Sequence, residues 1–493
     1  MISMLKYMFS HKDNLKGQAK TGSVWVSLSK LGINVLNFLV VLILMRYFLG
    51  PEEFGLVQIA ILFSEIVNLF TLQGISDTLI YIDEDSRKID SLFYLIIFLG
   101  FLAFLAFFFG ASTISGFYKL DLGLIFKLMS VNFFVIAAGA TPMALLRKRM
   151  QLREESIIQF VSQIVAAVST LVLAVFKFGV YAIIGGMCLK YLAILIMGFL
   201  ASGYRPRWFF SIRIIKSLFA YIKFVTGEAL VMFVLNRSDQ FIVSKFFSAA
   251  IFGFYSQAFN FINYPLSISR MTFHTVLFSV FSKVQEDLEE MRRMFVVVNR
   301  HIATLFIPLF MGFGAVADLF VSGVLGEQWE PCVPYIYIFT VFALIKIVGV
   351  TLPQTIKSIG KPQHLFYYNL VRMIVLIPAL LASTLLHQPI WTAIIMVGIM
   401  LIFKPVEWVM LKRTVGIEVR EYLSIFFIPL SASVVMALGI FWIKRVCAGC
   451  HSILLLAITI LCGMILYTGV SFLLDRQGSK RFLYFIRSYV KPE

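Results

Sequence analysis

Charged residues are scarce in this chain of 493 residues. Lys, Arg, Asp and Glu together make up 14% of it, whereas 60% is hydrophobic, and the mean hydropathy is +0.90. A soluble domain carries about 25% charged residues. One soluble core cannot bury this much apolar surface, so the composition excludes a soluble enzyme, a disordered chain and a disulfide-rich secreted module.

Motifs of nucleotide-binding and hydrolytic enzymes are also missing. The sequence contains no GxxxxGK[ST], GxGxxG, HExxH or GxSxG pattern. Direct ATP hydrolysis by this chain is therefore not expected, while coupling to an ion gradient or to the membrane potential stays open. We expect no cofactor and no bound metal.

Cysteine is rare, with five residues in the chain, and one pair has a notable spacing. The segment Cys447-Ala448-Gly449-Cys450-His451 matches a c-type haem attachment motif. It lies in a short turn between two apolar stretches, without a surrounding pocket or an axial partner. A local disulfide or two unmodified thiols is therefore the preferred interpretation.

Long apolar runs dominate what the chain does contain. About 14 of them have the roughly 20-residue length at which a helix spans a bilayer. They lie at roughly 22–46, 55–79, 91–111, 124–146, 157–176, 180–201, 219–243, 250–277, 296–317, 333–356, 365–386, 389–411, 422–443 and 452–474. No connection is longer than about 20 residues, so no soluble domain is inserted. The expected fold is an all-α polytopic membrane protein.

The distribution of basic residues predicts an orientation. The net charge is +17, and about 27 Lys and Arg fall in the tails and even-numbered connections, against about 6 in the odd-numbered ones. Examples are Arg147-Lys148-Arg149, Arg205, Arg207, Lys412 and Arg413. Basic residues are retained on the cytoplasmic side. We expect both termini to be cytoplasmic and no nucleic-acid partner.

A weak internal repeat divides the chain. Phe54-Gly55 and Ala60 recur as Phe252-Gly253 and Ala258, each at the start of a predicted span. Two copies of a six-helix unit, in parallel orientation, explain this. The predicted segments are a cytoplasmic tail 1–21, an N-lobe 22–217, a C-lobe 218–413, two further helices in 414–475 and a cytoplasmic tail 476–493.

Charges inside the predicted spans are the most informative residues. The cations are Lys30, Lys127, Lys190, Lys223, Arg237, Arg270, Arg300, Lys346, Arg372 and Lys404, and the acids are Glu65, Asp77, Glu228, Asp239, Asp318 and Glu407. Each cation facing lipid at mid-membrane costs about 2.5–3.5 kcal/mol. They must face protein or a water-filled cavity. Some have simpler explanations: Lys404 and Glu407 are spaced for pairing, and Lys190, Arg300 and Lys223 can extend to the interface.

Polar residues form stripes on two of these spans. Lys30, Asn34 and Asn37 share one helix face, and Asn263, Ser267, Arg270 and His274 share another. We interpret the stripes as walls of a cationic cavity for an anionic cargo; the alternative is interhelical hydrogen bonding. The candidate cargo ligands are Lys30, Asn34, Lys127, Arg237, Asn263, Arg270, Lys346 and Arg372, with Arg270 foremost. Ion-coupling candidates are Asp77, Glu228, Asp239 and Asp318, unless they pair with nearby cations.

Several motifs resemble those of bacterial polysaccharide flippases. Arg46 with Gly50-Pro51-Glu52-Glu53-Phe54-Gly55 is similar to their Arg…Gly-Pro-x-x-Phe-Gly signature, and Asn236-x-x-Asp239 with Gly253-x-Tyr255-x-x-Ala258 to a later one. Val276-Leu277-Phe278…Gln285-Glu286-Asp287 resembles a third, with Ser279 in place of the usual Pro, and Gly326-Glu327-Gln328-Trp329 matches Gly-x-x-Trp. The resemblance covers roughly residues 20–475.

The resemblance implies a fold, a cargo and partners. The superfamily includes lipid II flippases and multidrug exporters. Its fold has two six-helix lobes in a V and here two further C-terminal helices. The implied function is flipping of polyprenyl-pyrophosphate-linked oligosaccharide across the bacterial inner membrane by alternating access, beside a polysaccharide polymerase and glycosyltransferases. A multidrug or other lipid-linked-glycan exporter is the alternative, and a polymerase or ligase is disfavoured because no large outer loop exists.

Overall fold

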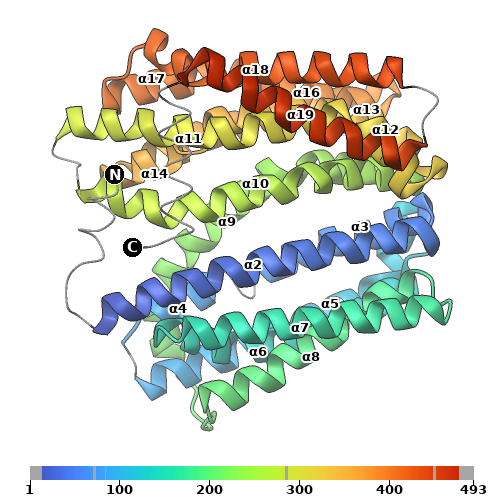
Figure 1. Ribbon diagram of the computed structural model, residues 1–493. Coiled ribbons are helices and arrows are strands. Elements are labelled where there is room, and N and C mark those ends of the chain that lie inside the picture. The colour runs from blue at the N-terminus through green and yellow to red at the C-terminus, as the bar shows by residue number, and fades with distance from the viewer. Residues whose placement is uncertain (1–13, 70–73, 84, 284–286, 448–450, 477–493) are drawn as a thin grey trace. The chain divides into compact units, whose positions relative to one another are not determined.

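The structure, a computed structural model, describes residues 14–69, 74–83, 85–283, 287–447 and 451–476. Some side chains inside helices, including those of Asp77, Arg270 and His274, are also outside this description, as is Cys450 of the predicted Cys447–Cys450 pair. All regular secondary structure in the described residues is helical (Figure 1). The chain forms two compact units, residues 1–253 and 254–493.

The first unit contains eight helices among its described residues and the start of a ninth. They are α2 (Asn14–Tyr47), α3 (Pro51–Asn68), α4 (Gly74–Tyr81), α5 (Ser86–Tyr118), α6 (Gly123–Lys148), α7 (Leu152–Val175), α8 (Val180–Ser202), α9 (Ile212–Phe246) and the first turn of α10 (Ala249–Lys283). The closest pairs are α5 with α6, α7 with α8, and α6 with α8, while α2 packs on α7.

The second unit continues α10 and adds the remaining helices. These are α11 (Leu288–Ala315), α12 (Ala317–Phe320), η2 (Val321–Leu325), η3 (Glu327–Cys332), α13 (Val333–Val348), α14 (Leu352–Ser358), α15 (Pro362–Ser383), η4 (Thr384–Leu386), α16 (Pro389–Ile402), α17 (Lys404–Val415), α18 (Val419–Val446) and α19 (Ser452–Leu474). Figure 1 shows α18 lying along both α11 and α19, and these pairs are in contact.

The helices confirm a polytopic membrane protein. Within the described residues, 11 helical segments are long and apolar enough to cross a membrane, and a bent pair, Ile212–Phe219 and Tyr221–Phe246, makes up to 12. Every predicted span overlaps a helix. Among the described residues, the predicted span 333–356 corresponds to α13 and α14, and 389–411 to α16 and α17, although each pair makes one candidate membrane crossing.

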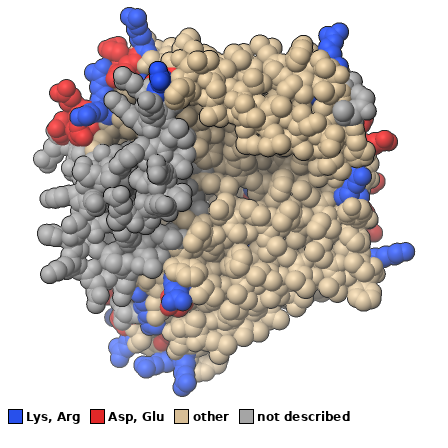
Figure 2. Space-filling model, viewed as in Figure 1, with Lys and Arg blue, Asp and Glu red and all other residues tan. Residues whose placement is uncertain are grey.

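Charged side chains gather at the helix ends. Figure 2 shows Lys, Arg, Asp and Glu mainly at the two edges of the visible face, with uncharged surface between them. At one of these ends Glu53 accepts a hydrogen bond from the backbone amide of Gly50 (3.0 Å) and so caps α3. Asp85, the residue before α5, caps that helix by accepting a hydrogen bond from the amide of Arg87 within it (2.9 Å). Apolar middles and charged ends are the pattern a bilayer imposes.

The repeat residues identified in the sequence meet each other inside the first unit. A methyl carbon added at Gly55 would overlap the carbonyl oxygen of Ala249, and one added at Gly253 would overlap that of Pro51. The two contacts are equivalent, because Pro51 precedes Gly55 by the same four residues by which Ala249 precedes Gly253. Only glycine lets two helix backbones approach this closely. The repeated Phe-Gly therefore marks a crossing of α3 with the start of α10.

Candidate functional site

The clearest intramembrane charge pair in the first unit joins α9 to α3. Arg237 Nη2 lies 2.6 Å from Glu65 Oε1, and Arg237 Nη1 donates to Gln240 Oε1 at 3.2 Å. The side chains of Arg237 and Glu65 are 20% and 33% exposed. A charge-assisted bond between two helices satisfies both groups away from water. Arg237, predicted as a cargo ligand, is thus held by an acid in this structure.

The other predicted cations of the first unit lie in different surroundings. Lys30 on α2 and Lys127 near the start of α6 are both exposed. The Lys127 ammonium lies 5.9 Å from the centre of the Phe108 ring on α5. The structure brings neither lysine to the Arg237–Glu65 pair through a contact that we can identify.

The polar stripe on α2 is partly used for packing. Asn37 Oδ1 accepts a hydrogen bond from Gln163 Nε2 of α7 at 2.6 Å, and Ser29 Oγ donates to the carbonyl of Ser156 at 2.9 Å. Asn34, between them on the helix, is half-buried. At Ser29 and Asn37, then, interhelical hydrogen bonding explains the polar residues.

A second cluster of charges is buried in the second unit. Lys404 Nζ lies 2.6 Å from Glu407 Oε2, and the Tyr368 hydroxyl donates to Glu407 Oε1 at 2.7 Å. Arg372 lies one turn beyond Tyr368 on the same helix, α15. The Lys404 and Glu407 side chains are only 15% and 8% exposed. Lys404 and Glu407 thus form an ion pair, and Arg372 is a further cation close enough to act electrostatically on Lys404.

Two helix interruptions meet at this cluster. Gly349 separates α13 from α14, and Phe403 separates α16 from α17. A methyl carbon at Gly349 would lie 2.6 Å from Lys404 Nζ and would overlap Glu407 Oε2. Next to Gly349, the Val348 carbonyl accepts a hydrogen bond from Tyr422 (2.5 Å). Irregular backbone at membrane depth needs such partners inside the protein.

The remaining predicted cargo ligands belong to the second unit. Lys346 on α13 lies 4.8 Å from the centre of the Phe342 ring. Asn263 on α10 is half-buried, and Ser267, on the same face, donates to the Tyr264 carbonyl at 2.7 Å. The Arg270 side chain lies outside the described residues. Arg372, the last predicted ligand of this unit, is the cation described above beside the Lys404–Glu407 pair.

The four ion-coupling candidates differ in their surroundings. Asp318 is bound by Lys444 of α18 at 2.5 Å, which is the ion-pairing alternative considered for these acids. Asp239 is 1% exposed in α9, whereas Glu228 on the same helix is exposed. The Asp77 side chain lies outside the description. Among the described residues, no group of three or more His, Cys, Asp or Glu is arranged to hold a metal ion.

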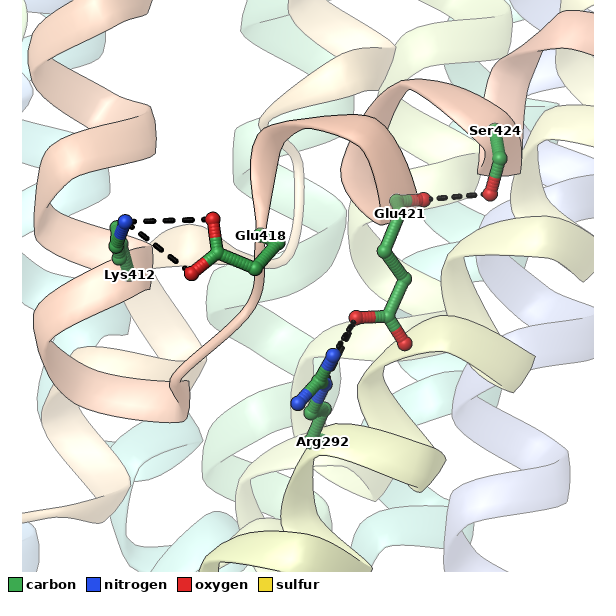
Figure 3. Close-up of polar contacts among 5 residues, drawn as sticks. All are labelled: Arg292, Lys412, Glu418, Glu421 and Ser424. Carbon is green, nitrogen blue, oxygen red and sulfur yellow. Dashed lines mark hydrogen bonds and ion pairs between the residues drawn. The ribbon is translucent and has the colours of Figure 1, made fainter.

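A polar network at the start of α18 was not anticipated from the sequence (Figure 3). Arg292 of α11 donates through Nε to Glu421 Oε2 at 2.7 Å, and Lys412 of α17 lies 3.2 Å from Glu418 Oε1. The partners of the first pair are 129 positions apart, so spacing along one helix gives no signal for them. These pairs attach the beginning of α18 to α11 and α17.

Long apolar helices with charges paired between them define a polytopic membrane protein. Residues 43–334 match the family described as "Polysaccharide biosynthesis protein". This match covers more than half of the chain, which therefore belongs to that family.

Several known proteins are similar to this chain over most of its length. "Succinoglycan biosynthesis transport protein ExoT" of Rhizobium meliloti is 24% identical, over 93% of this chain and 94% of that protein. "Lipopolysaccharide biosynthesis protein WzxC" of Escherichia coli is 23% identical, over 84% and 85%. "Uncharacterized membrane protein in cps region" of Klebsiella pneumoniae is 26% identical, over 84% and 87%. Of the three, ExoT is named as a transport protein and the Klebsiella pneumoniae protein as a membrane protein.

Solved structures share the fold. "Lipid II flippase MurJ, inward closed conformation" has a TM-score of 0.76 at 14% identity and covers 92% of this chain and 99% of that one. An inward-facing multidrug resistance transporter of the MATE family has a TM-score of 0.54 at 12% identity, covering 81% and 94%. At these identities the likeness establishes the fold alone.

Proposed function

We infer that this protein flips polyprenyl-pyrophosphate-linked oligosaccharide units across the bacterial inner membrane by alternating access, for assembly of a surface polysaccharide. The observation that carries this proposal is the match of residues 43–334 to the polysaccharide biosynthesis family. The likeness in fold to a protein named as a lipid II flippase supports it, since lipid II is itself a lipid-linked saccharide.

The proposal includes an architecture. The 11 segments that meet the criteria for spanning, together with α3, α9 and α10, make the fourteen helices of two six-helix lobes and two C-terminal helices. An even number of crossings places both termini on one side, and the basic connections favour the cytoplasm. Glycosyltransferases would build the lipid-linked units before transfer, and a polysaccharide polymerase would act on them afterwards.

The charge of the interior suits an anionic cargo. Arg372 lies near the Lys404–Glu407 ion pair, so this group of three carries two positive charges and one negative charge and would attract an anion. Pyrophosphate oxygens accept charge-assisted hydrogen bonds from guanidinium groups in a bidentate manner. We assign cargo contacts to Arg372 and, on the α10 stripe, to Arg270; Lys30 is a separate candidate in the first unit. Arg237 would contact cargo only after leaving Glu65.

Transport by the purified protein tests the function directly. The chain would be reconstituted in vesicles with a fluorescent polyprenyl-pyrophosphate oligosaccharide, and a membrane-impermeant reagent would measure how much cargo reaches the outer leaflet. Flipping well above protein-free vesicles is expected. If lipid-linked saccharide does not move while a cationic drug is exported, the chain is a multidrug exporter of the same fold.

Coupling is tested in the same vesicles. Asp239 and Glu228 of α9 and Asp77 of α4 are the candidates, while Asp318 is already paired with Lys444. Flipping with an imposed proton or Na⁺ gradient would be compared with flipping without one. A rate that ignores both gradients, in vesicles that hold them, removes these acids as coupling sites.

A further inference from the structure

The loop between α8 and α9, residues 203–211, has a composition unlike that of the other connections. It reads Gly-Tyr-Arg-Pro-Arg-Trp-Phe-Phe-Ser, with four aromatic residues beside two arginines. Because it joins two membrane helices, it lies at a membrane surface. Trp208 is 96% exposed and Phe210 is 55% exposed. Exposed aromatic side chains of this size are stable where the chain meets lipid headgroups.

The loop is fixed in place by the first turns of α5. The Tyr204 hydroxyl donates to Asp90 Oδ1 at 2.6 Å, and the backbone amide of Ser211 donates to Ser91 Oγ at 3.2 Å. Burial and the Asp90 carboxylate raise the pKa of Tyr204, which keeps its hydroxyl protonated as a donor. The Tyr204 ring packs against Phe93 at 5.5 Å. The loop is thus anchored at both of its ends.

The anchoring leaves Trp208 at the surface instead of burying it. Its ring stacks on Tyr94 of α5, with centroids 5.6 Å apart and planes inclined by 20°. Next to it, Arg87 lies over the ring of Phe209 at 5.7 Å. The result is a flat aromatic platform with one open face, built by α5 and the loop together.

The basic residues near this platform divide into two groups. Arg147 binds Glu155, Lys148 binds the carbonyls of Leu79 and Ile82 at the end of α4, and Arg149 binds the Ser202 carbonyl at the end of α8. Those three cations stabilise the fold. In contrast, the exposed side chains of Arg205 and Arg207 make no hydrogen bond or ion pair with any residue that the structure describes.

We propose that residues 203–211 form a binding site for anionic phospholipid headgroups, with Trp208 in the interface and Arg205 and Arg207 on the lipid phosphates. Basic residues beside a membrane are attracted to anionic lipids. Arginine forms bidentate bonds with phosphate, and indole prefers the headgroup level. The site is separate from the intramembrane charges assigned to cargo.

Thermal unfolding in vesicles tests the proposal without any transport measurement. The full chain would be reconstituted in phosphatidylcholine alone and in phosphatidylcholine containing phosphatidylglycerol. The anionic lipid should raise the Tm of the wild type by about 2–4 °C, because a ligand that binds the folded state stabilises it. The double variant Arg205→Gln/Arg207→Gln should keep its Tm in phosphatidylcholine and lose most of this rise.

Matched variants separate a site from general attraction. Arg420→Gln removes an exposed arginine flanked by Glu418 and Glu421, so it should keep the full rise. Trp208→Ala should lose part of it, whereas Trp391→Ala, in the first turn of α16 and beside a connection without Lys or Arg, should not. If the double variant gains as much Tm from phosphatidylglycerol as the wild type, the loop is not the site.

A fluorescence measurement locates Trp208 independently of stability. The difference between wild type and Trp208→Phe isolates the emission of Trp208. Phosphatidylglycerol with brominated chains should quench that emission, and iodide in the aqueous phase should not. Quenching by iodide with none from the brominated lipid places Trp208 in water and overturns the proposal.

Discussion

Arg237 and Glu65 illustrate at the scale of single residues how a charge is tolerated inside a membrane. Each alone would cost about 2.5–3.5 kcal/mol at mid-membrane on the insertion scale. At 2.6 Å from each other, the two side chains exchange a charge-assisted hydrogen bond between α9 and α3. Removing one partner leaves the other charge without compensation, whereas removing both does not.

Glu65→Gln should therefore destabilise the protein by about 2–3 kcal/mol, because Arg237 keeps its charge. Adding Arg237→Gln should recover most of the loss. Glu52→Gln, an exposed acid on the same helix, is the control and should have little effect. Thermal unfolding in detergent measures the wild type and the three variants. If the double variant is as unstable as Glu65→Gln, the loss of stability does not come from the unpaired charge of Arg237.

Arg372 provides a test of cargo binding. Replacement by Ala should lower flipping about tenfold to a hundredfold, the loss expected for a charged hydrogen bond. Arg372→Lys should restore only part, since Lys lacks the bidentate geometry. The vesicle assay with equal amounts of folded protein measures this. Full transport by Arg372→Ala would leave Arg372 with a purely structural role beside Tyr368.

The sequence predicted some residue pairs and not others, for a physical reason. Lys404 and Glu407 are three positions apart, so helix geometry alone placed them together, and the structure has them at 2.6 Å. Arg237 and Glu65 were both recognised as intramembrane charges, but 172 positions separate them. Helical periodicity contains no information on which helices are neighbours.

At the scale of elements, the predicted spans overlap helices of the structure, and two of them contain a short break inside one candidate membrane crossing. The runs 333–356 and 389–411 were expected as single helices, but breaks occur at Gly349 and Phe403. Gly349 and Pro405 were visible in the sequence as signals for such breaks. What could not be read is that the two breaks meet, since that depends on how α13 and α16 pack against each other.

Gly349→Ala tests the contact between the two breaks. The added methyl group would lie 2.6 Å from Lys404 Nζ, so the cluster must shift and stability should fall by about 1–3 kcal/mol. Gly398→Ala in α16, where a methyl group meets nothing within 4 Å, is the control. In a Lys404→Ala/Glu407→Ala background the cost of Gly349→Ala should shrink. If Gly349→Ala costs the same stability in that background, the requirement for glycine at 349 does not come from Lys404 and Glu407.

The glycine crossing of α3 and α10 predicts a symmetrical pair of effects. Gly55→Ala and Gly253→Ala should each destabilise by at least about 2 kcal/mol, because the methyl group overlaps a backbone carbonyl that cannot move aside like a side chain. Gly110→Ala in α5, which meets nothing within 4 Å, should be neutral or slightly stabilising. Thermal unfolding is the measurement. Two unaffected glycine variants would contradict the crossing.

At the scale of the whole molecule, composition and periodicity predicted the class and the helical fold. Both depend on the solvent that surrounds the chain, and a bilayer imposes helices of known length. The number of crossings is less certain from hydropathy, because α3 carries Glu52, Glu53 and Glu65 within its 18 residues. An odd number of crossings separates the termini and an even number does not. Orientation thus depends on helices whose hydropathy is ambiguous.

Reporter fusions decide this last question. A reporter that is active only in the cytoplasm should give a signal when fused after Glu493, since fourteen crossings and the basic connections place both termini inside. The same reporter inserted after Gln388, between α15 and α16, should be silent, because that connection has no Lys or Arg and is predicted to lie outside. Alkaline phosphatase, which is active only outside, should give the reverse pattern at both positions. Activity of the phosphatase after Glu493, in a fusion of normal abundance, would contradict the cytoplasmic C-terminus and would mean either an inverted orientation or an odd number of crossings.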